Sequence, residues 1–281
     1  MNTNLTKRAL AVLLLATSVI TAQEFHGKAE YFSKRIMKKV TEQVTEKIEM
    51  KNNPELQGLL EEAMKKASEK QYVLIFNKIE CLYEEEQKLD KPEANNGMSV
   101  TVSFSSAGKK YLNLKDKNSI VEDNIFGKEF LVVEPLVKPE WKLIDETKKI
   151  GEYNCFKAEL VIPVSEKQKK EYEEFLKKEE KKPALFKIEK PEDKIVTAWY
   201  SPEIPVSFGP DNYWGLPGLI LEVNDGDNML LCSKVVLTNK EKTEIKAPTN
   251  GKKITQKKFD EILKKKTESM QNEDGVIIFQ Q

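Results

Sequence analysis

Apolar and polar positions alternate along most of this chain, in short runs that end at Gly, Pro, Asn or Lys. Such runs predict β-strands, and their spacing of about 8–12 residues favours an antiparallel meander over parallel βαβ units. The runs lie at 27–36, 71–83, 100–104, 110–114, 119–123, 129–136, 140–145, 151–163, 195–200, 219–223 and 229–238, with shorter candidates at 244–247 and 276–279. The predicted fold class is therefore α+β and β-dominated: a single antiparallel curved sheet or half-barrel with a few helices inserted or packed against it.

Three segments have helical periodicity instead. From Pro54 to Lys70, apolar residues recur at offsets of three and four, and Asn53 before Pro54 supplies a cap. Segment 165–182 opens with a Ser-x-x-Gln capping box but consists mostly of Lys and Glu, so we expect a charged helical insertion that protrudes from the sheet. A third helix is expected to begin near Thr255.

The N-terminal segment has the pattern of a signal peptide. Lys7 and Arg8 precede a short apolar run that ends in small residues at Ala22. We predict cleavage after Ala22, export to the periplasm or beyond, and one β-rich domain over residues 23–281. The apolar run is shorter than the roughly 20 residues of a membrane span, and no later segment approaches that length, so no membrane insertion is expected.

Charge excludes one class of partner. The chain has 46 Lys and Arg against 46 Asp and Glu, and removing Lys7 and Arg8 leaves a small acidic excess. The two signs are interleaved rather than grouped, which argues against a nucleic-acid-binding surface.

The three cysteines, Cys81, Cys155 and Cys232, all lie in apolar, strand-like sequence. They are interpreted as small buried hydrophobic residues. Export would permit a disulfide, and a Cys155–Cys232 bridge is the alternative.

One stretch differs from the rest of the chain. Between Ser201 and Gly218 it holds four of the 12 prolines and three of the 12 glycines, with aromatic residues around them. Pro217 followed by Gly218 predicts a type II turn with positive φ at the glycine. We interpret the stretch as a rigid corner that borders a possible cleft. Its candidate residues are Trp199, Tyr200, Glu203, Pro205, Gly209, Pro210, Trp214, Gly215, Leu216, Pro217 and Gly218.

The motif Gly-Leu-Pro-Gly-Leu-Ile at 215–220 resembles the signature of the GLPGLI family of exported proteins from Gram-negative bacteria. The flanking sequences Gly-Glu-Tyr-Asn-Cys-Phe-Lys-Ala at 151–158 and Ala-Trp-Tyr at 198–200 also resemble that family, as do Glu-Ile-Pro at 203–205 and Gly-Pro at 209–210. The resemblance is strongest from about 141 to 232. It implies secretion and a β-rich domain, and it brings no established activity with it.

Catalytic signatures are scarce. His26 is the single histidine, so neither a multi-histidine metal site nor a histidine-containing triad is expected near the motif. The sequence contains no nucleophile elbow, P-loop or dinucleotide fingerprint, and it indicates no cofactor or metal. The Asn224–Asp227 turn is expected to close a hairpin rather than to bind Ca²⁺.

We therefore expect a non-enzymatic envelope protein that holds a hydrophobic ligand or a peptide, or that assists an outer-membrane partner. Two alternatives are a hydrolase using Glu203 and Asp211 as an acid/base pair, and a purely structural secreted domain.

Overall fold

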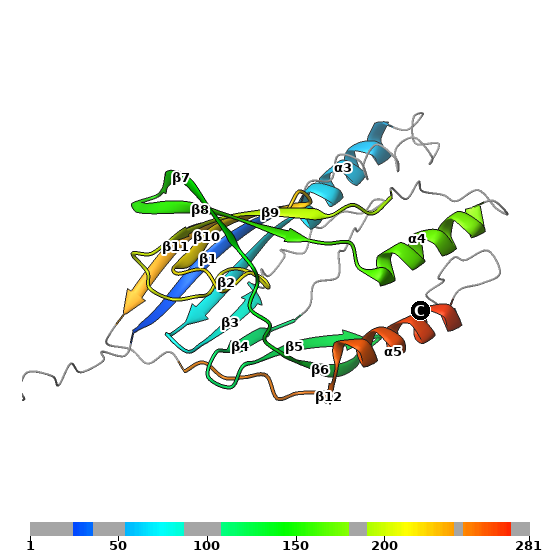
Figure 1. The fold of residues 1–281 in the computed structure, drawn as a ribbon. Helices are drawn as coiled ribbons and strands as arrows, with labels where there is room; N and C mark the ends of the chain where they lie inside the picture. The colour runs from blue at the N-terminus through cyan, green and yellow to red at the C-terminus, as the bar shows by residue number, and fades with distance from the viewer. Residues whose placement is uncertain (1–24, 36–53, 87–107, 180–189, 239–243, 271–281) are drawn as a thin grey trace, which may run out of the picture.

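The computed structural model describes residues 25–35, 54–86, 108–179, 190–238 and 244–270. Twelve strands among these residues form one open sheet with the order β12-β6-β5-β4-β3-β2-β1-β11-β10-β9-β8-β7 (Figure 1). The paired strands run antiparallel except for β12 and β6, which are parallel. The predicted β-dominated, curved antiparallel sheet is confirmed.

The strands are β1 (His26–Arg35), β2 (Glu69–Phe76), β3 (Glu80–Glu85), β4 (Lys110–Asn113), β5 (Asn118–Ile125), β6 (Lys128–Pro135), β7 (Lys142–Ile150), β8 (Tyr153–Ile162), β9 (Lys194–Ser201), β10 (Leu219–Asn224), β11 (Asn228–Thr238) and β12 (Lys252–Ile254). The helices are α3 (Pro54–Ser68), α4 (Glu166–Glu179) and α5 (Gln256–Met270).

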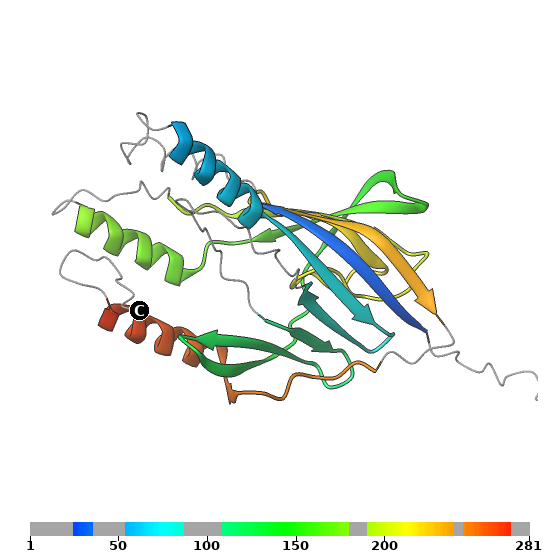
Figure 2. The same ribbon diagram turned by 180° about the vertical axis from the view of Figure 1, so that it is seen from behind.

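The sheet bends into a trough. Strands β2–β6 rise on one side of β1 and β11, and β7–β9 rise on the other, as Figures 1 and 2 show from opposite directions. The helices α3, α4 and α5 of the described residues extend beyond one end of this trough. The charged helix α4 therefore extends away from the sheet, as predicted for the insertion.

The concave face of the trough carries the core. Tyr31 of β1 pairs in register with Tyr72 of β2, and the neighbouring pair on this face is Ala29 with Leu74. Segment 202–218, which connects β9 to β10, lies inside the trough and buries apolar side chains against these strands. Its contributors, Ile204, Val206 and Phe208, are at most 4% exposed. The concave face is therefore filled along this part by the chain itself.

The predicted helices form where local sequence favours them. In α4 the Ser165 hydroxyl and the Gln168 side chain make the predicted capping box, in which the Gln168 N–H donates to Ser165 Oγ at 3.2 Å. Helix α5 packs on β6 through an edge-to-face contact of Phe259 with Phe130. None of the described helices is long and apolar enough to cross a membrane.

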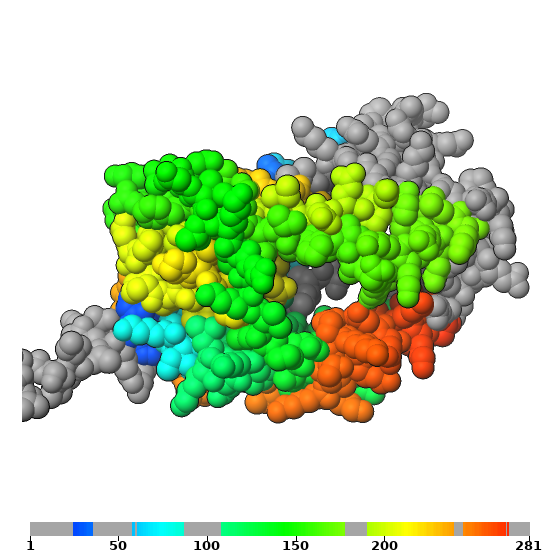
Figure 3. All heavy atoms as spheres, in the orientation of Figure 1, coloured from blue at the N-terminus to red at the C-terminus, as the bar shows by residue number. Residues whose placement is uncertain are grey.

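Helices α4 and α5 enclose a groove of about 660 Å³, lined in part by Phe175 and Leu263. Figure 3 shows the hollow between them. The Lys167 ammonium lies 2.7 Å from the Asp260 carboxylate and links the two helices.

Two strand predictions are wrong in detail. Residues 71–83 form a hairpin rather than one strand, because the Asn77 carboxamide oxygen accepts the N–H groups of Ile79 and Glu80 and turns the chain. Residues 244–247 have no strand pairing, whereas the short strand β12 was not predicted. The predicted signal segment 1–22, the runs 100–104 and 276–279, and the cap residue Asn53 lie outside the described residues.

The structure contains no Cys155–Cys232 disulfide, and all three cysteines are free thiols in it. Cys155 lies on β8 and Cys232 on β11, with β9 and β10 between them in the sheet.

Candidate ligand-binding pocket

Segment 202–218 is held in the trough by its own backbone. The Leu219 N–H donates to the Ile204 carbonyl at 3.0 Å, and the Ile220 N–H donates to the Phe208 carbonyl at 3.0 Å. The Gly215 N–H donates to the Ser207 carbonyl at 2.9 Å. The prolines cannot donate, so the segment crosses the concave face irregularly, as expected, instead of extending the sheet.

The predicted type II turn at Pro217–Gly218 is wrong, because Gly218 does not have the positive φ that such a turn needs. Glycine is required there for another reason. A Cβ on Gly218 would lie 2.3 Å from the Ser201 carbonyl oxygen, and backbone atoms cannot give way at that distance. The motif glycine with positive φ is Gly215, at +95°.

The aromatic and proline residues of the predicted cleft mainly support the fold. The Lys148 ammonium lies 4.3 Å from the ring centre of Trp199, and Tyr200 packs against Phe156. The Trp214 carbonyl accepts the indole N–H of Trp141 at 2.8 Å. Of the remaining candidates, Gly209, Pro210 and Leu216 are buried, whereas Pro205 and Pro217 are exposed.

The two carboxylates of the predicted acid/base pair have separate partners. Glu203 is exposed, and its Oε1 accepts the backbone N–H of Asn154 at 3.0 Å and its side-chain amide at 2.8 Å. These hydrogen bonds lower the pKa of Glu203, so it is poorly suited to act as a proton donor. Asp211 forms an ion pair with Lys110 of β4 and lines a pocket to which, among the described residues, Glu203 does not contribute.

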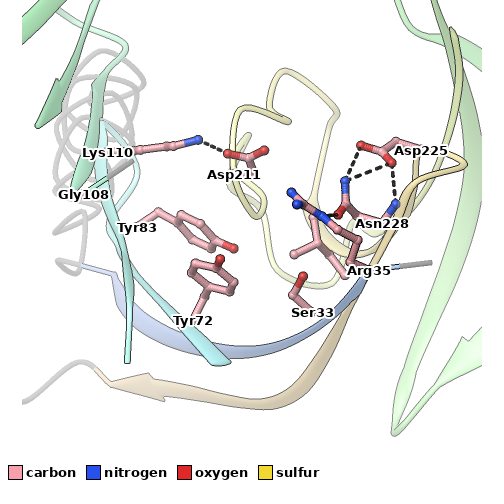
Figure 4. A pocket seen from close by; sticks show the side chains of 10 residues that line it. Ser33, Arg35, Tyr72, Tyr83, Gly108, Lys110, Asp211, Asp225 and Asn228 are labelled. Carbon is pink, nitrogen blue, oxygen red and sulfur yellow. Dashed lines mark hydrogen bonds and ion pairs between the residues drawn. The ribbon is translucent and has the colours of Figure 1, made fainter. Parts of the chain in front are cut away.

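That pocket has a volume of about 210 Å³ and lies within the trough (Figure 4). Its lining comes from five strands, from the backbone of Gly108 and from the two connections that flank β10. Its lining residues are Ser33, Arg35, Tyr72, Tyr83, Gly108, Lys110, Asp211, Asp225, Asn228 and Leu230. We call this site the tyrosine pocket.

Tyr72 and Tyr83 form one wall of the pocket. Their rings stack with centroids 5.0 Å apart and an interplanar angle of 11°. Figure 4 shows both hydroxyls pointing toward the middle of the pocket, with the Ser33 hydroxyl directed toward the same space. Tyr83 is only 3% exposed, yet within the described residues its hydroxyl has no hydrogen-bond partner. The hydroxyl oxygen is not one of the buried unpartnered atoms of the described residues, so it is open to the cavity and available to a ligand.

The environment keeps both phenols protonated. Burial raises the pKa of Tyr72 to about 12, with the charges of Glu85 and Asp211 acting in the same direction and Arg35 opposing them. Burial also raises the pKa of Tyr83 well above its ordinary value, again assisted by Asp211. At neutral pH both hydroxyls are therefore hydrogen-bond donors rather than bases.

Charged groups of both signs line the opposite side. The Arg35 Nε donates to the Asn228 side-chain oxygen at 3.2 Å, which orients the guanidinium. Asp225 accepts the Asn228 backbone N–H at 2.8 Å and the Tyr213 hydroxyl at 3.0 Å, and it lies 3.0 Å from the Lys194 ammonium. The predicted hairpin turn at 224–227 is thus present, and its carboxylates bind a lysine. Within the described residues, no group of three His, Cys, Asp or Glu side chains is placed to hold a metal.

Of the pocket's lining residues, sequence reasoning singled out only Asp211 as a candidate functional residue. Ser33 and Arg35 continue the face of β1 that carries Ala29 and Tyr31, so polar residues at the end of an otherwise apolar face were the available signal. That signal is weak when the order of the strands in the sheet is unknown. The remaining pocket residues come from segments whose proximity depends on that order.

The fold and pocket define a class: an open, curved antiparallel sheet whose trough encloses a small polar cavity. Residues 141–222 match a family described as "Protein of unknown function (Porph_ging)". The comparison with curated proteins gave no match.

Two solved structures of PNGF-II, in space groups C2 and P21, are similar to this chain at 15% and 16% identity, with TM-scores of 0.47 and 0.46. They align with 86% and 87% of this chain and with 33% and 34% of their own, so this chain spans about a third of their length.

Proposed function

We propose that this chain is an exported, non-enzymatic binding protein that holds one small polar molecule in the tyrosine pocket. The observation that carries the proposal is the Tyr83 hydroxyl, which belongs to a residue only 3% exposed, points into the cavity and has no hydrogen-bond partner among the described residues. This hydroxyl is open to the cavity, so a ligand there can exchange hydrogen bonds with it directly.

The pocket favours a polar ligand over the hydrophobic one expected from the sequence. Ile204, Val206 and Phe208 fill the apolar part of the trough that such a ligand would need. The remaining cavity of about 210 Å³ is below the range of about 300–1,000 Å³ that is typical of drug-sized ligands. It therefore suits a single small metabolite better than a lipid chain or an extended peptide.

Binding is favoured over catalysis by the state of the titratable groups. Burial raises the pKa values of the Tyr72 and Tyr83 phenols further above neutral pH. A general base is most effective when its pKa lies near the working pH. The predicted Glu203 and Asp211 pair does not share this pocket. The hydrolase alternative thus loses the geometry that would have supported it.

We also propose that the chain belongs to the GLPGLI family and is exported. The matched region 141–222 includes the whole hexapeptide at 215–220, and segment 1–22 has the pattern of a cleavable signal. Expression of the full chain in a Gram-negative host tests export. The periplasmic protein should begin at Gln23, and a product retained in the cytoplasm with residues 1–22 intact would contradict it.

The binding proposal is tested by a thermal-shift screen of the purified protein against a library of small polar metabolites. Wild type should be stabilised by at least one compound, and Tyr83→Phe should lose that shift. Tyr200→Phe is the matched control, because Tyr200 is similarly buried but does not line the pocket. The proposal is overturned if no compound stabilises the wild type, or if Tyr83→Phe responds as the wild type does.

A further inference from the structure

We infer that the ligand of the tyrosine pocket is an uncharged polyhydroxyl compound, whose hydroxyls donate to the Asp211 carboxylate and accept hydrogen bonds from Tyr72 and Tyr83. This inference rests on the proposed binding function and specifies the chemical class of the ligand.

The charged side chains of the pocket balance one another. Among the described residues, its lining includes two cationic side chains and two carboxylates, those of Arg35, Lys110, Asp211 and Asp225. Lys110 is paired with Asp211. Lys194 lies 3.0 Å from both Asp225 and Asp227, so the two signs remain equal in number when this lysine and its exposed second partner are included. A charged ligand would bring an uncompensated charge into the cavity, and burying such a charge is costly.

Neither sign of charge is favoured beside the phenols. Asp211 and Glu85 both act to raise the pKa of each pocket tyrosine, so the field at the phenol hydroxyls opposes a negative group. A positive group is opposed in turn by Arg35 and Lys110, which line the same cavity. An uncharged ligand avoids both penalties.

The pocket offers hydrogen-bond donors and acceptors together. Figure 4 shows the hydroxyls of Tyr72, Tyr83 and Ser33 directed toward its middle, and these have no partner in the part of the chain that the structure describes. Because both phenols stay protonated at neutral pH, each can donate to a ligand oxygen. Asp211 Oδ1 binds Lys110, whereas its other carboxylate oxygen is turned away from that lysine and can accept. An alcohol hydroxyl both donates and accepts, so it can pair with either kind of group.

The backbone fixes the Asp211 carboxylate in place. The φ of this residue is +57°, a left-handed conformation that Asp and Asn adopt more readily than other residues with a side chain. The Tyr213 N–H donates to the Pro210 carbonyl at 3.2 Å and closes the turn around it. Since Asn tolerates the same conformation, Asp211→Asn is a selective test of the carboxylate.

Isothermal titration calorimetry at neutral pH with matched probes tests the ligand class. Sorbitol, gluconate and glucamine share one hydroxylated carbon chain and differ only at a terminal carbon, which carries a hydroxyl, a carboxylate or an ammonium group. Sorbitol or its cyclic counterpart myo-inositol should bind the wild type, and the preferred one shows whether the ligand is linear or cyclic. Gluconate and glucamine should bind at least about tenfold more weakly than that neutral probe.

Variants of the Lys110–Asp211 pair should change this selectivity in opposite directions. Asp211→Asn removes the acceptor and the partner of Lys110, so the neutral probe should bind at least about tenfold more weakly while gluconate gains relative to it. Lys110→Met leaves Asp211 without its lysine, and glucamine should gain instead. Glu203→Gln is the matched control, because it neutralises an exposed carboxylate of the same segment outside the pocket lining and should bind all probes as the wild type does. Circular dichroism of each variant establishes that the sheet is intact.

The outcomes separate the two proposals. Binding of a neutral probe that is lost in Asp211→Asn supports the polyhydroxyl class. Charged probes that bind the wild type as tightly as the neutral ones, or a neutral probe that binds Asp211→Asn as it binds the wild type, overturn it. If none of the probes binds, the polyhydroxyl class is wrong, and a compound found in the metabolite screen would still uphold the binding function. If that screen is also negative, the proposed function itself fails.

Discussion

Segment 202–218 and the tyrosine pocket are neighbours in the trough, but the polar groups of the segment are hydrogen-bonded within the protein and the hydroxyls of Tyr72 and Tyr83 are not. In the segment, backbone N–H groups donate to carbonyls, and the Tyr213 hydroxyl donates to Asp225 at 3.0 Å. In the pocket, the hydroxyls of Tyr72 and Tyr83 converge without a partner among the described residues. A polar network completed within the protein stabilises a fold, whereas one left incomplete is available for recognition.

The most unusual stretch of the sequence supplies little of the tyrosine pocket. Segment 202–218 fills the trough beside the pocket, and its glycines allow close backbone contact. The pocket is assembled from ordinary strand residues that become a site only when the strands pair.

The largest expected effect comes from Gly218→Ala. Because the new Cβ would lie 2.3 Å from the Ser201 carbonyl oxygen, the segment must move, and we expect a loss of about 3 kcal/mol in the free energy of unfolding. Urea denaturation measures it. Gly58→Ala is the control, since Gly58 lies in α3 and a Cβ there would have no atom within 4 Å, so it should stabilise by about 1 kcal/mol. A Gly218→Ala variant as stable as wild type would remove the close-contact explanation.

Asp225→Asn tests the anchor between the segment and the β10–β11 hairpin. It removes a charge-assisted contact with Lys194 and weakens the hydrogen bonds that Asp225 accepts, and we expect a loss of about 2 kcal/mol at pH 7. Asp227→Asn, at an exposed partner of the same lysine, should change stability by less than about 0.5 kcal/mol. Similar losses in both variants would contradict the anchoring role.

The same residue gives a pH dependence. Burial acts to raise the pKa of Asp225, but the hydrogen bonds from Asn228, Lys194 and Tyr213 outweigh it and lower the pKa below its ordinary value of 3.8. A lowered folded-state pKa contributes stability that is present above about pH 4 and lost as pH falls through the folded value. The difference between wild type and Asp225→Asn should therefore shrink between pH 7 and pH 3, and a difference that grows on acidification would contradict this sign.

A pair of tyrosine variants sharpens the contrast directly. Tyr213→Phe removes a hydroxyl whose hydrogen bond to Asp225 is 3.0 Å long and should cost about 1 kcal/mol. Tyr83→Phe removes a hydroxyl that is open to the cavity and has no partner among the described residues, and it should change stability by less than about 0.5 kcal/mol. Thermal unfolding of both variants without added ligand measures the difference. Equal destabilisation would show that the Tyr83 hydroxyl is satisfied in the free protein.

The smallest expected effect concerns the cysteines. Protein purified without reductant should have all three thiols, and its unfolding should not change when reductant is added. Burial raises the pKa of Cys155 to about 11 and that of Cys232 to about 12, so alkylation of the native protein at pH 8 should be slow. In denaturant all three should react. Only one reactive thiol under those conditions would restore the disulfide.

Much of the fold could be predicted because its signals are local. The apolar stripe of α3 and the capping box between Ser165 and Gln168 depend on residues only a few positions apart. The turn at Asn77 was missed because the surrounding apolar residues continue the strand pattern on both sides of it. The type II turn was predicted from Pro217 and Gly218 alone, whereas the actual constraint is the Ser201 carbonyl, 17 positions away in sequence.

The sequence by itself determined the β-dominated class, the helices and the place of the rigid segment, since periodicity, caps and proline act over short stretches of chain. Only the tertiary structure decided that Arg35, Tyr72, Tyr83 and Asp211 share a cavity. Their meeting depends on strand order, sheet curvature and the path of segment 202–218 through the trough. These properties are set by contacts between distant parts of the chain, which local pattern does not record.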